Sequence, residues 1–461
     1  MKNSISIFVL LCISSAHLFA QQWWNVGSAG FSTSAAPYTS IAIDGSGTPY
    51  VAYQDSAKIP KATVMKYNGT SWVNVGSAGF STSTAEYTSI AIDGSGTPYV
   101  AYRDAGNKTK ATVMKYNGTS WVYVGSAGFS AGAAFYTSIA IDGSGTPYVA
   151  YRDAGNSSKA TVMKYDGSNW VNVGSAGFSP GGAYNTSIAI DRSGTPYVAY
   201  RDAGNSYKAT VMKYNGTSWV NVGSAGFSAG AAAFISIAID GSGTPYVAYG
   251  DDGNSSKATV MKYNGTSWVN VGSAGFSAGG AYYTSIAISP NGIPVVAYQD
   301  DGNSSKATVM KYDGSNWVNV GSAGFSAGVV YYTSIAISPN GIPVVAYQDV
   351  YNSHKVTVMK SSTLTTVSVT VDVPKTYTLY QNYPNPFNPT TEISYMLSAI
   401  SFVTLKVYDV LGRDVKTLVN ERQNAGTYNV TFDGRGLPSG VYFYSITAGS
   451  FSATKKLVLM K

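Results

Sequence analysis

A polar segment with the spacing Asp-x-x-Asn-x-x-Lys recurs every 49 residues in consecutive copies, and in three of them an arginine precedes the aspartate. Each copy brings a carboxylate, an amide and an ammonium group close to aromatic residues. Sugar recognition needs such a set, because hydroxyls require paired polar partners and the apolar faces of a pyranose require a ring. The sequence therefore predicts a repeated glycan-binding site. Its candidate residues are Arg103, Asp104, Asn107, Lys110, Arg152, Asp153, Asn156, Lys159, Arg201, Asp202, Asn205, Lys208, Asp251, Asn254, Lys257, Asp300, Asn303 and Lys306.

The same residues allow two other interpretations. In a structural one, the aspartate caps a turn, Gly-Asn takes a left-handed backbone conformation, and the lysine pairs with the aspartate. In the other, the pairs Asp251-Asp252 and Asp300-Asp301 contribute to a calcium site, although the alternating oxygen ligands of a calcium loop are missing.

Catalytic groups are scarce in the repeated region, which holds one glutamate, Glu86, and one histidine, His354. A catalytic acid and base must differ from copy to copy, whereas the aspartates here recur in every copy. We therefore expect a non-catalytic extracellular binding protein that engages its ligand through several weak, equivalent sites. A polysaccharide-acting enzyme and a purely structural surface protein are the alternatives. No cofactor or metal is expected, since Cys12 is the only cysteine.

The elements that must position these residues come from an internal repeat. Tryptophans stand 49 residues apart, at Trp23, Trp72, Trp121, Trp170, Trp219, Trp268 and Trp317. Each repeat contains four short runs rich in Val, Ile, Thr and Tyr, which are separated by Gly, Pro, Asn or Asp and read as antiparallel strands. Seven four-stranded units in tandem predict an all-β fold with a seven-bladed β-propeller over residues 21–360.

The phase of the repeat predicts how the ring closes. The seventh copy lacks its fourth strand, and the segment that begins at Trp23 supplies one at the other end of the repeats. Pairing the two would leave no open edge. The alternating strands also place the turns DGSGTP and NGTS on one face, and the longer loops, with the candidate residues, on the other. The layout of the repeats resembles that of bacterial seven-bladed propeller repeats and, more distantly, of secreted propeller lectins, which implies the fold.

The C-terminal part follows a predicted linker at 361–376. It contains QNYPNPFNPTT, LKVYDVLGRDV, GLPSGVYFY and a closing KKLVLMK, among short runs typical of strands. The runs predict a small Ig-like β-sandwich over residues 377–461. The motifs closely resemble the C-terminal sorting domain of the type IX secretion system (Por secretion tail). This resemblance implies a Gram-negative bacterium, the type IX machinery as a partner, and a secreted or surface-attached product.

The first 20 residues, with Lys2 and an apolar run from Ile5 to Ile13, predict a secretory signal peptide. No later apolar stretch is long enough for a transmembrane helix. The net charge of +7 is spread thinly, with +3 over residues 21–360, and lysines recur evenly near aspartates. That distribution argues against nucleic-acid binding. We expect a monomer.

Overall fold

The computed structural model describes residues 22–57, 59–361, 376–423 and 426–460. The predicted signal peptide and all but two residues of the predicted linker, Ser361 and Thr376, lie outside these ranges. Two compact units are present, one on each side of the linker, and each is described by itself. No helix within the described residues is long and apolar enough to cross a membrane.

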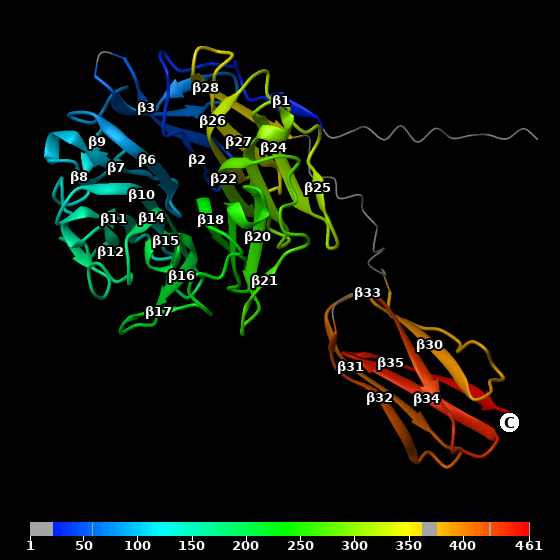
Figure 1. The fold of residues 1–461 in the computed structure, drawn as a ribbon. Coiled ribbons are helices and arrows are strands. Elements are labelled where there is room, and N and C mark those ends of the chain that lie inside the picture. Colours follow the sequence, from blue (N-terminus) through cyan, green and yellow to red (C-terminus); the bar gives the residue numbers. More distant parts are fainter. Residues whose placement is uncertain (1–21, 58, 362–375, 424–425, 461) are drawn as a thin grey trace, which may run out of the picture. The chain divides into compact units, whose positions relative to one another are not determined.

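The first unit consists of seven four-stranded antiparallel sheets, which Figure 1 shows arranged around a common centre. We number these blades 1 to 7 in chain order. Blades 1 to 3 are β2 (Ser40–Ile43), β3 (Pro49–Asp55), β4 (Lys61–Tyr67) and β5 (Trp72–Asn74); β6 (Ala85–Ile92), β7 (Pro98–Asp104), β8 (Lys110–Tyr116) and β9 (Trp121–Tyr123); and β10 (Ala134–Ile141), β11 (Pro147–Asp153), β12 (Lys159–Tyr165) and β13 (Trp170–Asn172).

The remaining four blades repeat this pattern. They are β14 (Ala183–Ile190), β15 (Pro196–Asp202), β16 (Lys208–Tyr214) and β17 (Trp219–Asn221); β18 (Ala232–Ile239), β19 (Pro245–Asp251), β20 (Lys257–Tyr263) and β21 (Trp268–Asn270); β22 (Ala281–Ile288), β23 (Pro294–Asp300), β24 (Lys306–Tyr312) and β25 (Trp317–Asn319); and β26 (Val330–Ile337), β27 (Pro343–Asp349), β28 (Lys355–Ser361) and β1 (Trp23–Asn25). The predicted seven-bladed propeller is confirmed.

Ring closure also follows the prediction. In blade 7 the outer strand is β1, whose Trp23, Trp24 and Asn25 pair with Ser361, Lys360 and Met359 of β28. The last propeller strand thus extends one residue into the predicted linker. The strand nearest the N-terminus completes the sheet that the seventh repeat leaves short, so blade 7 has four strands like the other six blades.

Neighbouring blades are joined by the repeated tryptophans. The indole Nε1 of Trp121 in blade 2 donates a hydrogen bond of 2.6 Å to the carbonyl oxygen of Val75, and its ring stacks on Phe80 at 4.1 Å between centroids. Val75 and Phe80 follow the outer strand of blade 1, so each tryptophan holds two blades together. Stacked aromatic pairs of this kind stabilise a core beyond the area that they bury.

The first strand of every blade lines the centre of the ring, and these strands contact one another in a closed circuit. Their free edges are satisfied by short side chains. The backbone N–H of Ile90 in blade 2 donates to Ser40 Oγ of blade 1 at 3.2 Å, and the Thr88 hydroxyl donates to the carbonyl of Tyr38. Serine and threonine side chains therefore bridge neighbouring inner strands, which belong to separate sheets.

The second unit is a β-sandwich, as predicted. Its two sheets have the orders β29-β30-β33 and β32-β31-β34-β35. Sequence reasoning missed the strand at Asp414–Gln423, because its many polar residues leave no clear alternation of apolar and polar positions. The strands are β29 (Thr378–Leu379), β30 (Thr390–Leu397), β31 (Ser401–Tyr408), β32 (Asp414–Gln423), β33 (Gly426–Asp433), β34 (Gly440–Ala448) and β35 (Phe451–Leu459).

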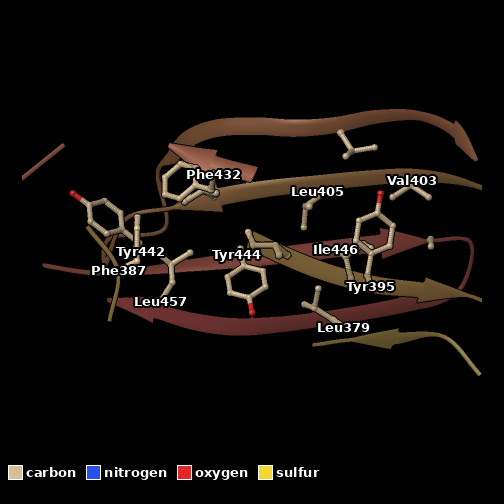
Figure 2. Packing of buried hydrophobic residues seen from close by; sticks show 14 of the residues in the cluster. Leu379, Phe387, Tyr395, Val403, Leu405, Phe432, Tyr442, Tyr444, Ile446 and Leu457 are labelled. Carbon is tan, nitrogen blue, oxygen red and sulfur yellow. The ribbon is translucent and has the colours of Figure 1, made fainter. Parts of the chain in front are cut away.

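Both sheets of the sandwich contribute to one apolar core, in which Leu379, Tyr395, Leu405, Tyr444 and Ile446 are buried (Figure 2). The NPFNP motif packs into the same core through Phe387. The backbone N–H of Phe387 donates to the carbonyl of Val458 at 2.9 Å, and its carbonyl accepts from Met460. The recurring Pro-Asn motif is thus an integral part of this domain.

Candidate ligand-binding face

The propeller has two different faces. On the turn face, tight turns join the first strand of a blade to the second and the third strand to the fourth. In the first of these turns in blade 2, the Asp93 carboxylate accepts hydrogen bonds from the backbone N–H groups of Ser95 and Thr97. Burial alone would raise the pKa of Asp93, but these hydrogen bonds lower it below its usual value. The longer loops lie at the opposite ends of the strands, and we call that side the loop face.

The predicted aspartates lie on the loop face but point into the protein. Asp104 is fully buried and caps a short 3-10 turn, where its carboxylate accepts from the Gly106 N–H, the Asn107 amide and the Thr112 hydroxyl at 3.0, 2.8 and 3.0 Å. Asp153, Asp202 and Asp251 make the same three kinds of contact, and Asp300 makes the first two. The turns are η1 (Ala105–Asn107), η2 (Ala154–Asn156), η3 (Ala203–Asn205), η4 (Asp252–Asn254) and η5 (Asp301–Asn303).

The structural interpretation of these loops is right about the aspartate and wrong in two details. The left-handed backbone falls on Lys108 and Thr109, with φ of 55° and 58°, and not on Gly-Asn. No salt bridge between Asp104 and Lys110 occurs among the described residues, although the two are paired in the strand register. The side chains of Asn107 and Lys110 and of their equivalents are half-buried: Asn156, Lys159, Asn205, Lys208, Asn254, Lys257, Asn303 and Lys306.

No group of three or more His, Cys, Asp or Glu side chains in the described part of the chain is placed to hold a metal ion. The pairs Asp251-Asp252 and Asp300-Asp301 are split between roles. The first carboxylate of each pair is buried in its turn, and the second is exposed and accepts a hydrogen bond from Ser256 or Ser305.

An aromatic opening lies at the centre of the loop face, where the inner strands begin. It leads into a cavity of about 250 Å³ lined by three consecutive residues from each blade. The first residue of each triplet has a left-handed backbone with φ between 49° and 56°. We call these seven residues the aromatic mouth: Tyr38, Tyr87, Tyr136, Asn185, Phe234, Tyr283 and Tyr332.

A β-bulge produces this conformation. In blade 2 the pairing of β6 with β7 is interrupted between Glu86 and Ser89, which leaves Tyr87 and Thr88 outside the ladder. The same interruption occurs in blades 3 to 7. Bulges re-aim side chains, and here each one places a mouth residue at the cavity.

The rings of the mouth contact one another around most of the circle. Centroid separations are 4.9 Å for Tyr38–Tyr87, 5.2 Å for Tyr87–Tyr136 and 5.2 Å for Tyr38–Tyr332. The circle of rings continues through Tyr332–Tyr283 at 5.1 Å and Tyr283–Phe234 at 4.8 Å. It is open only at blade 4, where Asn185 supplies an amide instead of a ring.

Four phenols of the mouth have a raised pKa. Burial raises the pKa of Tyr38, Tyr87, Tyr283 and Tyr332, and nearby phenols raise it further. They therefore act as neutral hydrogen-bonding groups on apolar rings.

The predicted arginines form an arginine arc (Arg103, Arg152 and Arg201) on the loop face of blades 2 to 4. The guanidinium of Arg152 lies 4.4 Å from the ring centroid of Tyr184 and 5.1 Å from that of Phe135. Arg103 lies 4.4 Å from Phe135 and pairs with Glu86 at 2.8 Å. Gln54, Gly250, Gln299 and Gln348 replace arginine in the other blades.

The sequence analysis did not identify the aromatic mouth, since none of its candidate residues lies there. A signal was present in the repeats themselves. Where the rest of the inner strand is nearly invariant, the two residues before Thr-Ser-Ile read Pro-Tyr, Glu-Tyr, Phe-Tyr, Tyr-Asn, Tyr-Tyr and Tyr-Tyr, with Ala-Phe before Ile-Ser-Ile. Variation at one fixed point of a repeat marks side chains that are not held by the shared core.

Residues 381–460 match the family described as secretion system C-terminal sorting domain. The C-terminal sandwich is therefore a sorting domain, which directs export by type IX secretion to the cell surface or the extracellular space. The type IX machinery is its partner. No curated protein matches the sequence.

Several solved structures have a similar fold at low identity. PorZ of Porphyromonas gingivalis, a surface component of the type IX secretion system, is 16% identical with a TM-score of 0.43, and the match covers 90% of this chain and 58% of PorZ. An ulvan lyase, a polysaccharide lyase, is 13% identical with a TM-score of 0.47 over 72% of this chain and 94% of the lyase. The Aleuria aurantia lectin is 18% identical with a TM-score of 0.43 over 65% of this chain and 100% of the lectin.

Proposed function

We propose that the propeller is a non-catalytic binding module that recognises an extracellular glycan at the aromatic mouth. The observation that carries this proposal is the left-handed backbone of the mouth residue in all seven blades. For a bulky side chain this conformation costs about 1–2 kcal/mol per residue. The bulge recurs from blade to blade and aims these side chains at the cavity, which favours a role for them in binding.

The chemistry of the mouth suits a sugar. Aromatic rings offer apolar faces to the C–H side of a pyranose, while neutral phenols, the Asn185 amide and the hydroxyls below them can exchange hydrogen bonds with sugar hydroxyls. The cavity is small, which favours a terminal unit or a short branch over a long chain.

The side chains that line the mouth suit binding without catalysis. The residues that line the mouth are Tyr, Phe, Thr, Ser, Ile and Asn, and none carries a charge at neutral pH. General acid–base catalysis needs a group that titrates near the working pH, whereas burial moves four of these phenols further from it.

Filling the gap in the mouth tests the proposal. Asn185→Tyr should close the aromatic circle, keep the melting temperature, because five blades already carry tyrosine here, and lower glycan affinity at least tenfold. The matched control is Asn172→Tyr on the outer strand, where Tyr123 is the natural equivalent one blade earlier. Both variants of the full chain would be tested on a glycan array and by calorimetry.

Stoichiometry separates the central site from the repeated loops. One mouth per chain predicts one bound glycan, whereas recognition through the Asp-x-x-Asn-x-x-Lys loops predicts several. Several equivalent sites that are unaffected by Asn185→Tyr would contradict the proposal. Cleavage of the bound glycan would favour the enzyme alternative.

A further inference from the structure

The charge of the loop face differs between blades. In blade 3 the loop carries two cations, Arg152 and Lys159, for one carboxylate, and blade 4 is the same. In blades 5 and 6 the arginine is replaced by Gly250 or Gln299, and a second, exposed carboxylate appears at Asp252 or Asp301. A nearly symmetric ring thus has a cationic sector beside an anionic one.

Aromatic contacts hold the cationic sector in a fixed geometry. Arg152 lies between Phe135 and Tyr184, and Arg201 lies 4.6 Å from the ring centroid of Tyr207. A guanidinium that stacks by its face keeps its N–H edge free for a planar partner. Carboxylate and sulfate oxygens are such partners, because they accept two parallel hydrogen bonds from one guanidinium.

The hydrogen bonds of the arc are incomplete. The Nε atoms of Arg103, Arg152 and Arg201 are buried and have no hydrogen-bond partner. Arg103 is neutralised by Glu86, and the Nη2 of Arg152 donates to Ser158 at 2.9 Å. Among the described residues, no hydrogen bond or salt bridge engages the guanidinium of Arg201. A ligand in solvent does not reach the buried Nε, but it can reach the outer N–H groups of the Arg201 guanidinium, which no described residue engages.

Blade 4 also connects the arc to the mouth. Tyr136 of the mouth lies 6.4 Å from Tyr184, and Tyr184 lies 5.9 Å from Tyr207, so rings continue from the cavity to Arg201. Tyr207 is 43% exposed and has a left-handed backbone with φ of 61°. The gap at Asn185 is in the same blade.

We infer that the glycan is acidic, and that a carboxylate or sulfate group on it binds Arg201 and Arg152 while its sugar rings lie over Tyr207 and Tyr184 toward the mouth. This inference rests on the proposed function and names its ligand class. The exposed carboxylates of Asp252 and Asp301 repel the same anion, which fixes the orientation of the ligand on the ring.

The test compares polymers that differ only in charge. Polygalacturonate and its fully methyl-esterified form test a carboxylate, and dextran sulfate and dextran test a sulfate. We expect the full chain to bind one charged polymer at least tenfold tighter than its neutral partner, with an affinity that falls as salt rises. The double variant Arg152→Gln/Arg201→Gln should remove this preference, so that charged and neutral polymers bind with similar affinity.

Two further variants exclude trivial explanations. Arg192→Gln removes the same charge from the turn face of blade 4, and should not alter binding. Arg201→Lys keeps the charge but loses the planar edge, and should recover only part of the affinity, while circular dichroism confirms that each variant is folded.

Equal binding of charged and neutral polymers, or a preference that survives Arg152→Gln/Arg201→Gln, would overturn the inference and leave the aromatic mouth in place. Failure of both charged polymers to bind would overturn it as well. If the unaltered chain binds no glycan at all, the proposed function itself is refuted.

Discussion

The indole Nε1 of Trp23 donates a 2.6 Å hydrogen bond to the carbonyl oxygen of Val320, across 297 positions of sequence. Its ring stacks on Phe325 with 4.1 Å between centroids. Both contacts reproduce those of the other six repeated tryptophans, although Trp23 reaches blade 7 from the opposite end of the repeats. The same side chain therefore serves both as a blade contact and as the ring closure.

Trp23→Ala should destabilise the propeller by about 3 kcal/mol, since removing a packed tryptophan leaves a cavity and an unpaired carbonyl. The neighbouring Trp24 is 55% exposed, so Trp24→Ala should cost less than about 1 kcal/mol. Urea unfolding of the two variants measures the difference. Equal stabilities would show that β1 does not close the ring.

Asp153→Ala should destabilise the protein by about 2–3 kcal/mol, because it leaves the Gly155 N–H, the Asn156 amide and the Thr161 hydroxyl without their acceptor. The exposed Asp252 is the matched control, and Asp252→Ala should be nearly neutral. Thermal unfolding compares them. A stable Asp153→Ala variant that loses only ligand binding would restore the aspartates as site residues.

Stability should fall steeply above pH 10. Burial raises the pKa of seven core tyrosines, and the following aspartate raises it further: Tyr53, Tyr102, Tyr151, Tyr200, Tyr249, Tyr298 and Tyr347. The unfolded chain loses these protons near pH 10 while the folded chain keeps them. Each tyrosine thus contributes stability that is complete below pH 10 and is lost at about 1.4 kcal/mol per pH unit above it.

Tyr151→Phe should make the free energy of unfolding fall less steeply above pH 10, by the contribution of one tyrosine. Tyr351→Phe changes a side chain that is 74% exposed, and should leave this slope unchanged. Denaturant unfolding between pH 9 and 11 gives both slopes. Identical slopes would contradict burial as the cause.

Removal of residues 377–461 should leave the protein in the periplasm of a bacterium that has type IX secretion, with the propeller folded. The reason is that the sorting domain is a separate unit with its own core. Cell fractionation with protease accessibility measures the location. Surface display of the truncated chain at normal levels would show that the address lies elsewhere.

The propeller could be predicted from the sequence because its contacts repeat. Each Trp, each turn and each Val-rich strand occurs in nearly every copy, so one unit specifies the whole ring, and the missing fourth strand of the last copy identifies the closure. The site was harder to predict. Asp104 and Lys110 have the residue types of a binding site, but only the folded structure shows that the Asp104 carboxylate turns inward.

The aromatic mouth depends on backbone conformation, and composition does not reveal it. A tyrosine at position 87 of an alternating strand would be assigned to one face or the other, and the bulge at Glu86–Ser89 changes that direction. The arginine arc depends on stacking between blades. Arg103 and Phe135 belong to different repeats, so their proximity follows from the ring and not from spacing within a repeat.

The pairing of β1 with β28 also determines when the propeller can finish folding. Hairpins within a blade join residues that are close in sequence and can form while the chain is still emerging. Closure of the ring requires β1, which is synthesised first, and β28, which is synthesised last in the propeller. A chain that lacks β28 therefore cannot close the ring. The sorting domain follows Ser361 in the chain, so the segment that directs export is made only after every strand of the ring is present.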